Sequence, residues 1–274
     1  MAESIILGIV QGIAEWLPVS SEGLIFLIKA NFFPGEESLT DILKLALFLH
    51  LGTFLAALVY FKKDVWLLLK ALFNDKKADK KTKSILDFLI IATIISGLLG
   101  LLFIKVLDSV EIDVAQGSRA ITLLVGLLLL VTAFLQFKVN YRKKTVSCSV
   151  NEDADRSKIK KRDGVILGIV QSLAVLPGLS RSGLTVSALL IRKFDESKAL
   201  KLSFLMSLPI VLGGNIILAI DSFSLSLEMF VALVFSFVFG LITIDLLLRL
   251  ARKVNFAIFV LIFAILTIAS VFAF

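Results

Sequence analysis

The chain has 274 residues, of which 58% are hydrophobic, and a formal net charge of +7. Its mean hydropathy of +0.97 excludes an ordinary soluble globular protein and indicates a polytopic membrane protein. The basic residues lie beside apolar segments, where they set the topology and contact anionic membrane lipids. We therefore expect no nucleic-acid partner.

Two kinds of apolar element follow one another along the chain. The stretch 5–33 is apolar but interrupted by Pro18 and a pair of serines, and the stretch 164–192 is broken in the same way. The first arm of 5–33, Ile5 to Leu17, would be about 20 Å long as a helix, too short to cross a hydrocarbon core of about 30 Å. Six further segments are long and apolar enough to span the membrane: 41–61, 85–106, 120–137, 203–220, 228–248 and 256–273.

The distribution of Lys and Arg predicts how these segments are oriented. The loop 62–84 carries eight lysines and the loop 138–163 carries nine Lys and Arg, so both are expected on the cytoplasmic side. Basic residues flank both ends of 164–192, whereas none precedes Lys29 in 5–33. The two broken stretches are therefore predicted to be re-entrant hairpins that enter the membrane from opposite faces.

An internal repeat supports this arrangement. The hexapeptide Ile6 to Gln11 recurs as Ile166 to Gln171, and each copy opens one of the hairpins. Three spans follow each hairpin, an odd number that inverts the second unit relative to the first. The predicted fold is therefore all-α and polytopic, with six transmembrane helices plus two re-entrant helical hairpins in an inverted-topology repeat. It forms a single integral membrane domain over 1–274: a first repeat at 1–137, a cytoplasmic basic loop at 138–163 and a second repeat at 164–274.

The hairpin tips carry the residues that indicate chemistry. Irregular backbone at membrane depth persists only where protein buries it or a polar cavity adjoins it, so the tips near Pro18 and Pro177 are expected to meet around a pocket. A short helix begins near Ser20 in one tip and near Ser180 in the other, and two such N-termini form a site for an anion. Arg181 offers a planar fork that suits phosphate oxygens. The hydroxyl donors around it are Ser180, Ser182 and Thr185.

A metal site is also predicted at the first tip. Gln11 and Glu15 are four residues apart and share one helix face, where their oxygens are candidate ligands for a divalent cation that bridges to a bound diphosphate. Two alternatives stay open. Glu15 would pair with Arg181 to hold the hairpins together, and Gln11 would make a hydrogen bond between helices.

Other polar residues have both a chemical and a structural interpretation. Ser21 is the candidate nucleophile or phosphate donor, whereas Ser20 is the better candidate for a helix N-cap. Glu22 is a favourable anion in the first turn of a helix, a general acid or base, or a further metal ligand. His50, the only histidine, is expected to be a packing residue inside a span. The segment 213–215, Gly-Gly-Asn, is expected to close helix packing.

Three tracts carry a resemblance to a known family: QGIAEWLPVSS at 11–21, LPGLSRSGLT at 176–185 and SFLMSLPIVLGG at 203–214. Together they resemble the undecaprenyl-diphosphate phosphatase family, also called the bacitracin-resistance protein. The resemblance implies an enzyme of the cell membrane, with an active site open to the outer face, that hydrolyses undecaprenyl or another polyprenyl diphosphate to the monophosphate and phosphate. This reaction recycles the lipid carrier for cell-envelope synthesis and confers bacitracin resistance. The resemblance also implies Mg²⁺ or Ca²⁺ as cofactor.

The same resemblance assigns roles to individual residues. Gln11 and Glu15 match the acidic motif of the family, which holds the metal, and Ser20 and Ser21 match its serine pair. Ser180, Arg181, Ser182 and Thr185 match its phosphate-binding tract. The expected catalytic residues are Glu15, Ser21, Arg181 and Glu22, and the expected substrate-binding residues are Ser20, Ser180, Ser182 and Thr185.

Two positions depart from the family pattern. The usual motif has a threonine and a histidine where this chain has Glu22 and Leu24, so we expect Glu22 to be the substitute proton carrier. The alternative function is a flippase or transporter for polyprenyl phosphate or another anionic lipid, which would release no phosphate. The sequence leaves the oligomeric state open, with a homodimer as one candidate.

Overall fold

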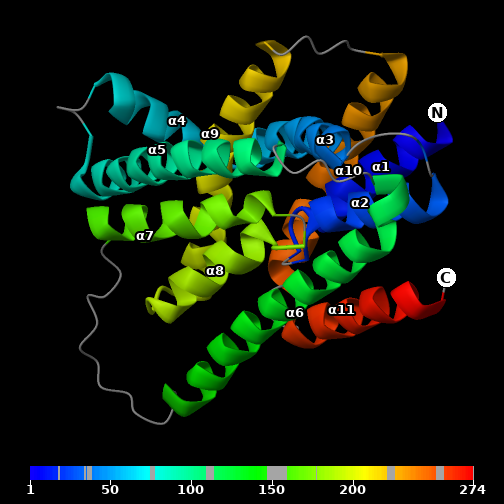
Figure 1. The fold of residues 1–274 in the computed structure, drawn as a ribbon. Helices are drawn as coiled ribbons and strands as arrows, with labels where there is room; N and C mark the ends of the chain where they lie inside the picture. Colours follow the sequence, from blue (N-terminus) through cyan, green and yellow to red (C-terminus); the bar gives the residue numbers. More distant parts are fainter. Residues whose placement is uncertain are drawn as a thin grey trace.

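A computed structural model describes residues 1–17, 19–33, 35, 39–74, 78–108, 114–146, 159–176, 178–220, 226–250 and 256–273. Over these residues the chain is helical and contains no strand, which confirms the predicted all-α class. The helices in chain order (Figure 1) are α1 (Ala2–Ala14), α2 (Ser21–Phe32), α3 (Leu39–Tyr60), α4 (Lys62–Phe73), α5 (Lys80–Asp108), α6 (Val114–Val146), α7 (Lys161–Ser172), the 3₁₀ helix η2 (Leu173–Val175), α8 (Arg181–Ile191), α9 (Glu196–Ile220), α10 (Leu227–Leu250) and α11 (Phe256–Ala273).

Four helices in the described part of the chain are long and apolar enough to cross a membrane: α3, α5, α9 and α10. They coincide with the predicted spans 41–61, 85–106, 203–220 and 228–248, and they identify a membrane protein. The predicted spans 120–137 and 256–273 fall on α6 and α11. The apolar stretches found in these two helices are shorter, Thr122–Lys138 and Val260–Ala269.

The predicted loop 62–84 is wrong at both ends, because α4 occupies Lys62–Phe73 and α5 begins at Lys80. Val65, Leu68 and Ala71 recur at every third position and pack against the protein, as one face of a helix does. The lysines of this segment indicated a loop, although lysine is itself a good helix former. The predicted loop 138–163 also begins later than expected, since α6 continues to Val146, and residues 147–158 lie outside the described residues.

Two helix pairs are broken in the middle and correspond to the predicted hairpins. The first pair is α1 and α2, and the second is α7 and α8 with η2 between them. Pro18 and Pro177, at the predicted tips, lie outside the described residues. Gly178 follows with a φ of 100°, and a Cβ there would lie 2.8 Å from Val125 O, so the turn requires glycine.

The first arm of each pair packs closely on a long helix from the other half of the chain. A Cβ on Gly8 of α1 would collide with Ala232 O of α10. A Cβ on Gly168 of α7, at the same place in the repeated hexapeptide, would lie 2.9 Å from Ala92 O of α5. Since neither residue has a side chain, each arm approaches the backbone of its partner helix directly.

An ion pair joins the two arms of each broken pair. Glu3 of α1 pairs with Lys29 of α2 at 2.6 Å, and Asp163 of α7 pairs with Arg192, the residue after α8. Glu3 and Asp163 have the same separation in sequence as Gly8 and Gly168. The acidic partner of the ion pair therefore lies at the equivalent position of the repeat in both pairs.

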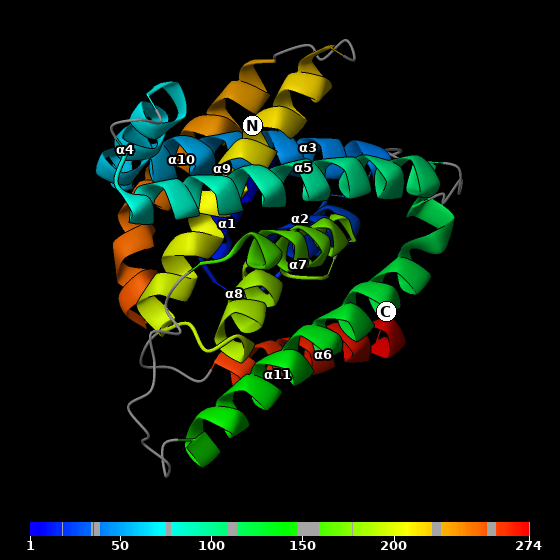
Figure 2. The same cartoon turned by 90° about the vertical axis from the view of Figure 1, so that its left-hand side faces the viewer.

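Two large clusters of buried apolar side chains form the core, beside a small third cluster around Ala174, Leu179 and Leu184. One unites α1, α2, α3, α6, α10 and α11, and the other unites α3, α5, α7, α8, α9 and α10. Both α3 and α10 contribute to the two large clusters and so join them. Figure 2 shows the same helices from the side.

The predicted packing role of the segment 213–215 is confirmed in part. Asn215 Nδ2 donates to Leu47 O of α3 at 3.0 Å, and a Cβ on Gly214 would lie 3.2 Å from the Leu47 side chain. Gly213 contributes no such contact, because a Cβ there would meet nothing within 4 Å.

Candidate active site

The breaks of the two helix pairs contact each other, as predicted. Ser20 Oγ accepts a hydrogen bond from Gly178 N at 3.0 Å. Ser182 Oγ donates to Leu17 O at 2.9 Å. Each pair therefore supplies a serine that bonds to the backbone of the other break.

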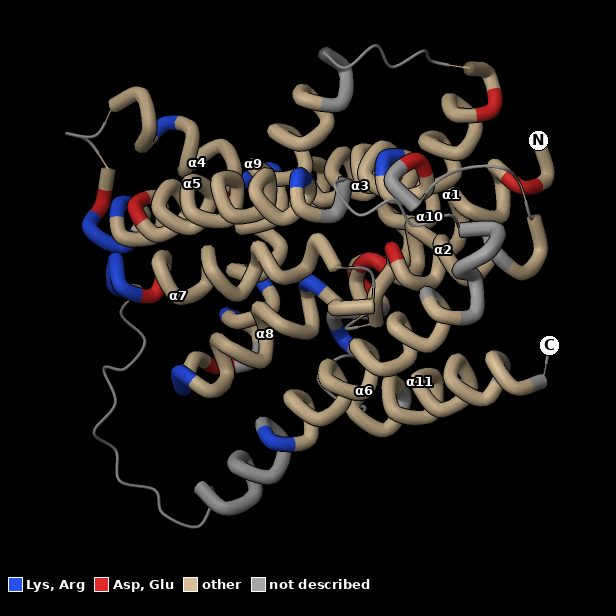
Figure 3. The backbone as a smooth tube through the Cα atoms, in the orientation of Figure 1, with Lys and Arg blue, Asp and Glu red and all other residues tan. Residues whose placement is uncertain are grey.

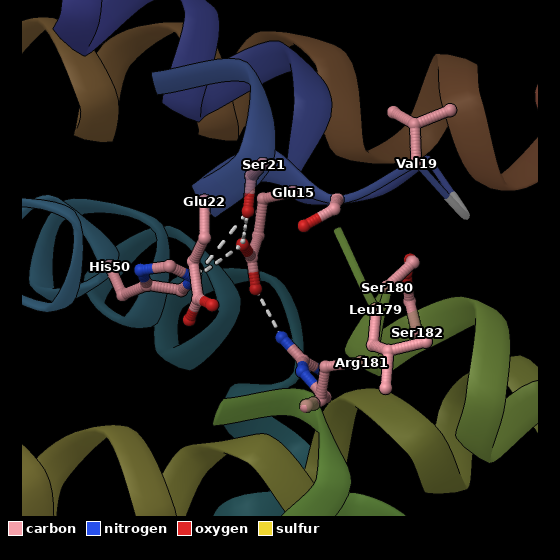
Figure 4. Close-up of a pocket in the computed structure, with 11 residues that line it drawn as sticks. Glu15, Val19, Ser21, Glu22, His50, Leu179, Ser180, Arg181 and Ser182 are labelled. Atoms are coloured by element: carbon pink, nitrogen blue, oxygen red, sulfur yellow. Dashed lines mark hydrogen bonds and ion pairs between the residues drawn. The ribbon is translucent and has the colours of Figure 1, made fainter. Parts of the chain in front are cut away.

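A pocket with about 270 Å³ of empty space opens at this junction (Figure 4). Its polar lining comes from three places: Glu15, Ser20, Ser21 and Glu22 of the first pair, Ser180, Arg181 and Ser182 of the second, and His50 of α3.

Glu15 lies at the centre of the polar network. Its Oε1 pairs with Arg181 across the junction. Its Oε2 accepts from Gln11 Nε2 at 2.9 Å and from Ser21 Oγ at 3.2 Å, and it lies 3.1 Å from His50 Nε2. A carboxylate out of water is stable only with partners of this kind. The ion pair with Arg181 that the sequence allowed is thus present, and it joins the two helix pairs.

His50 is not the packing residue that the sequence predicted. Its Nδ1 lies 2.6 Å from Ala46 O, which can only accept, and its Nε2 faces the Glu15 carboxylate and lies 3.5 Å from Ser21 Oγ. Both ring nitrogens therefore face acceptors, an arrangement that only the doubly protonated imidazolium satisfies in full. His50 brings a second cationic group to the pocket, beside Arg181.

The sequence did contain a signal for His50. Its apolar neighbours in α3 favoured a packing role, but an ionisable residue inside a membrane span marks a functional site by default. The contact with Glu15 was hidden because the two residues lie on different helices.

Ser20 and Ser180 begin the second helix of each pair. Ser20 Oγ accepts from Gly23 N and Ser180 Oγ accepts from Gly183 N, both at 3.1 Å, so each serine is an N-cap. The predicted starts of both helices are confirmed. Because both caps also line the pocket, the positive ends of α2 and α8 lie at it.

Two predicted site residues, Thr185 and Gln11, do not line the pocket, and each contacts a residue that does. Thr185 Oγ1 donates to Arg181 O at 2.8 Å and lies 2.6 Å from Ser203 Oγ. Arg181 Nη1 in turn donates to Ser203 O at 3.4 Å. The Ser203 carbonyl therefore holds the guanidinium, Thr185 links Ser203 to the Arg181 backbone, and Gln11 positions the Glu15 carboxylate.

The predicted metal ligands do not present oxygens to a common point. Both Glu15 oxygens already face donors, and Gln11 turns its amide nitrogen toward Glu15. Gln11 Oε1 is buried without a hydrogen-bond partner among the described residues. The same part of the chain contains no group of three or more His, Cys, Asp or Glu that could hold a metal. In this arrangement the donor set does not fit Mg²⁺ or Ca²⁺, and the cofactor stays a prediction.

Glu22 lies in the pocket beside His50 (Figure 4). It belongs to the first turn of α2, where the helix dipole favours an anion. Two of its predicted interpretations, the favourable anion and the proton carrier, are compatible with this position.

Long apolar helices around a buried network of opposite charges define an integral membrane protein with a polar site inside its helical body. The chain belongs to the family described as Bacitracin resistance protein BacA, whose pattern matches residues 4–269. The family resemblance of the three sequence tracts is thereby confirmed.

Relatives named undecaprenyl-diphosphatase are similar over nearly the whole chain. One from Methanococcoides burtonii is 41% identical over 99% of this chain and 98% of its own length. One from Haloarcula marismortui is 37% identical, covering 92% of this chain and 90% of its own. A third, from Methanothrix thermoacetophila, is 34% identical and covers 97% of this chain and 95% of its own length.

Proposed function

We propose that this protein hydrolyses undecaprenyl diphosphate to undecaprenyl phosphate and inorganic phosphate. The relatives carry the name of this activity. The observation that carries the proposal is a single pocket in which Arg181 of the second helix pair meets Glu15 and Ser21 of the first. The reaction would return the lipid carrier to cell-envelope synthesis and confer resistance to bacitracin.

The charge of the pocket suits a diphosphate. Arg181 and His50 are cationic, and the N-termini of α2 and α8 add partial positive charge. Phosphoryl transfer requires mainly positioning and neutralisation of the phosphate oxygens, which these groups supply from a fixed frame. The pocket accepts the headgroup while the apolar tail stays in lipid.

Glu15 holds the cationic groups until the substrate binds. Buried cations without a counter-charge would be costly, and Glu15 provides that charge to both Arg181 and His50. An entering diphosphate replaces the carboxylate as their partner. The cations are thus compensated before and after binding.

Ser21 is the proposed reacting hydroxyl. Its hydroxyl donates to Glu15 Oε2, so the carboxylate can accept the proton as Ser21 Oγ attacks the terminal phosphorus and the bond to the bridging oxygen breaks. Water then hydrolyses the phosphoserine and releases inorganic phosphate. In the alternative, Ser21 orients a water that attacks the terminal phosphorus directly. The His50 imidazolium can donate a proton to a phosphate oxygen of the departing lipid phosphate. Glu22, in the same pocket, is the second candidate for that donor.

The proposed topology is six spans plus two re-entrant hairpins, with the halves inverted relative to each other. Each broken pair packs on a long helix of the other half, which supports this topology. α1 packs on α10 and α7 packs on α5, in both cases through equivalent glycines. The ion pairs Glu3–Lys29 and Asp163–Arg192 support it as well. A two-fold relation between the halves accounts for both observations.

The protein is proposed to lie in the plasma membrane with its pocket open to the outer face. This orientation rests on the lysine-rich segments, whose basic character predicts the cytoplasmic side. The homodimer stays a prediction.

A phosphate-release assay on purified protein in detergent tests the proposed function. Undecaprenyl diphosphate should yield one inorganic phosphate per lipid, together with undecaprenyl phosphate, and undecaprenyl phosphate offered as substrate should yield none. The alternative of a lipid carrier is not favoured by the names of the relatives, and it predicts no release from either lipid. Repeating the assay with a chelator tests the predicted dependence on Mg²⁺ or Ca²⁺.

A further inference from the structure

The helix α4 presents an apolar face that no described part of the protein covers. Trp66, Leu69 and Phe73 recur at helical spacing and are 59%, 42% and 85% exposed. On the opposite face Leu68 packs against the core and Ala71 is buried. In both views α4 lies at the edge of the molecule, outside α5 (Figures 1 and 2).

Lysines border this apolar face. Lys63 and Lys70 are exposed, lie two turns apart on the same side of α4, and flank the stripe that contains Trp66. Lys70 Nζ lies 5.1 Å from the centroid of the Trp66 ring, so the cation and the aromatic side chain face the same surroundings. The neighbouring start of α5 adds Lys80 and Lys81, and basic residues gather at this end of the molecule (Figure 3).

The apolar face is continuous with surface that faces lipid. α4 follows α3 after a single residue, Phe61, and α3 is a candidate span whose last turn exposes Val59 and Tyr60. The next helix, α5, is also a candidate span. A helix that joins two spans therefore lies where hydrocarbon gives way to water.

A second copy of the chain suits this face less well. Lysines close to an apolar contact would lose water without a counter-charge, whereas an anionic leaflet supplies phosphate groups beside them. Trp at the level of the headgroups, with Lys alongside, is typical of helices that lie in a membrane surface.

We infer that α4 is an interfacial helix that inserts Trp66, Leu69 and Phe73 at the acyl boundary and binds anionic phospholipid headgroups through Lys63 and Lys70. This surface is separate from the pocket, and its role does not depend on the hydrolysis reaction. It would fix the protein to the anionic leaflet at the basic end of the molecule.

Tryptophan fluorescence in vesicles tests the inference, because the chain has only two tryptophans. Trp16 is 3% exposed, so a lipid quencher should reach Trp66 alone. Protein is reconstituted in phosphatidylcholine that contains a small fraction of phosphatidylglycerol, and either lipid carries bromine near its headgroup. Brominated phosphatidylglycerol should quench more than brominated phosphatidylcholine at the same fraction, and Trp66→Phe should remove the quenching.

The lysine variants give the sharper comparison. Lys63→Gln and Lys70→Gln should each lower the preference for the anionic quencher by about fivefold, as should added salt. Lys105→Gln, the same change near the other end of α5, should leave it unaltered. Folding of each variant is checked by helical circular dichroism in the same vesicles.

Two results would overturn the inference. One is equal quenching of Trp66 by the neutral and the anionic lipid. The other is efficient disulfide formation between copies of a Phe73→Cys variant in a Cys148→Ser background, which would assign the face to a second copy of the chain.

Discussion

At the scale of single residues, the pocket depends on how one carboxylate is shared. Glu15 faces Arg181 with one oxygen and faces Ser21 and His50 with the other. Arg181, His50 and the Ser21 hydroxyl, which we propose to be the reacting group, are therefore held by one carboxylate on the first helix pair. A ligand with phosphate oxygens can take over these contacts together. Glu15 and His50 are buried in the protein, and the pocket gives such a ligand access to them.

The first prediction separates two candidate proton carriers. His50→Gln keeps the size and hydrogen-bonding capacity of the side chain but removes its charge and its ability to donate a proton in the reaction. We expect the rate of phosphate release to fall by about 10²–10⁴-fold. Glu22→Gln, a change in the same pocket, should cost less than tenfold.

The measurement is the initial rate with undecaprenyl diphosphate, with thermal unfolding as the check on folding. A severe loss in Glu22→Gln with a normal rate in His50→Gln would reverse the assignment and restore Glu22 as the substitute for the missing motif histidine.

Sequence reasoning found most of the pocket because its residues cluster at two short breaks. Pro and Ser inside apolar stretches pointed to Ser20, Ser21, Ser180 and Arg181, which do line the pocket. His50 comes from a third, continuous helix, and no local pattern connects it to Glu15. The sequence also could not show which predicted residues line the pocket and which lie behind it. Thr185, for example, contacts Ser203 of α9, a helix that no local pattern connects to the second break.

At the scale of helices, contacts through glycine fix how the broken pairs sit on the long helices. Gly8 meets backbone of α10, so any side chain there must push two helices apart. Gly213 of α9 lies in open space and serves as a matched control.

We predict that Gly8→Val lowers the free energy of unfolding by about 1–3 kcal/mol, through the overlap with Ala232 O. Gly213→Ala should leave stability unchanged or raise it by up to about 1 kcal/mol, because alanine favours a helix. The midpoints of thermal unfolding in detergent compare the two. Equal midpoints would mean that α1 and α10 do not touch at Gly8.

The helices also show where pattern reading failed. Lysines made the segment 62–84 resemble a loop, whereas α4 turns Val65, Leu68 and Ala71 toward the protein and exposes most of its other residues. Long apolar helices such as α5 and α10 were predictable, because length and hydropathy alone define them.

At the scale of the whole molecule, the account requires hairpins that enter from opposite faces. In a Cys148→Ser background, a cysteine at exposed Phe32, after the first hairpin, should react with an impermeant maleimide only from outside the cell. A cysteine at exposed Lys161, at the start of the second, should react only from the cytoplasmic side. Labelling of both positions from one side would contradict the inverted repeat.

The central claim is that two distant breaks in the chain build one hydrolytic site. The rate of phosphate release from undecaprenyl diphosphate tests it most directly when one residue is changed in each break. We predict that Ser21→Ala and Arg181→Gln each reduce the rate by at least about 100-fold, since each removes a group that acts on the reacting phosphate.

Two controls change the same residue types outside the pocket. Ser207→Ala removes a buried hydroxyl that bonds within its own helix, and Arg249→Gln removes a guanidinium that is 69% exposed. Both should retain the wild-type rate within a few fold. A wild-type rate in either pocket variant would contradict the claim that both breaks form the active site.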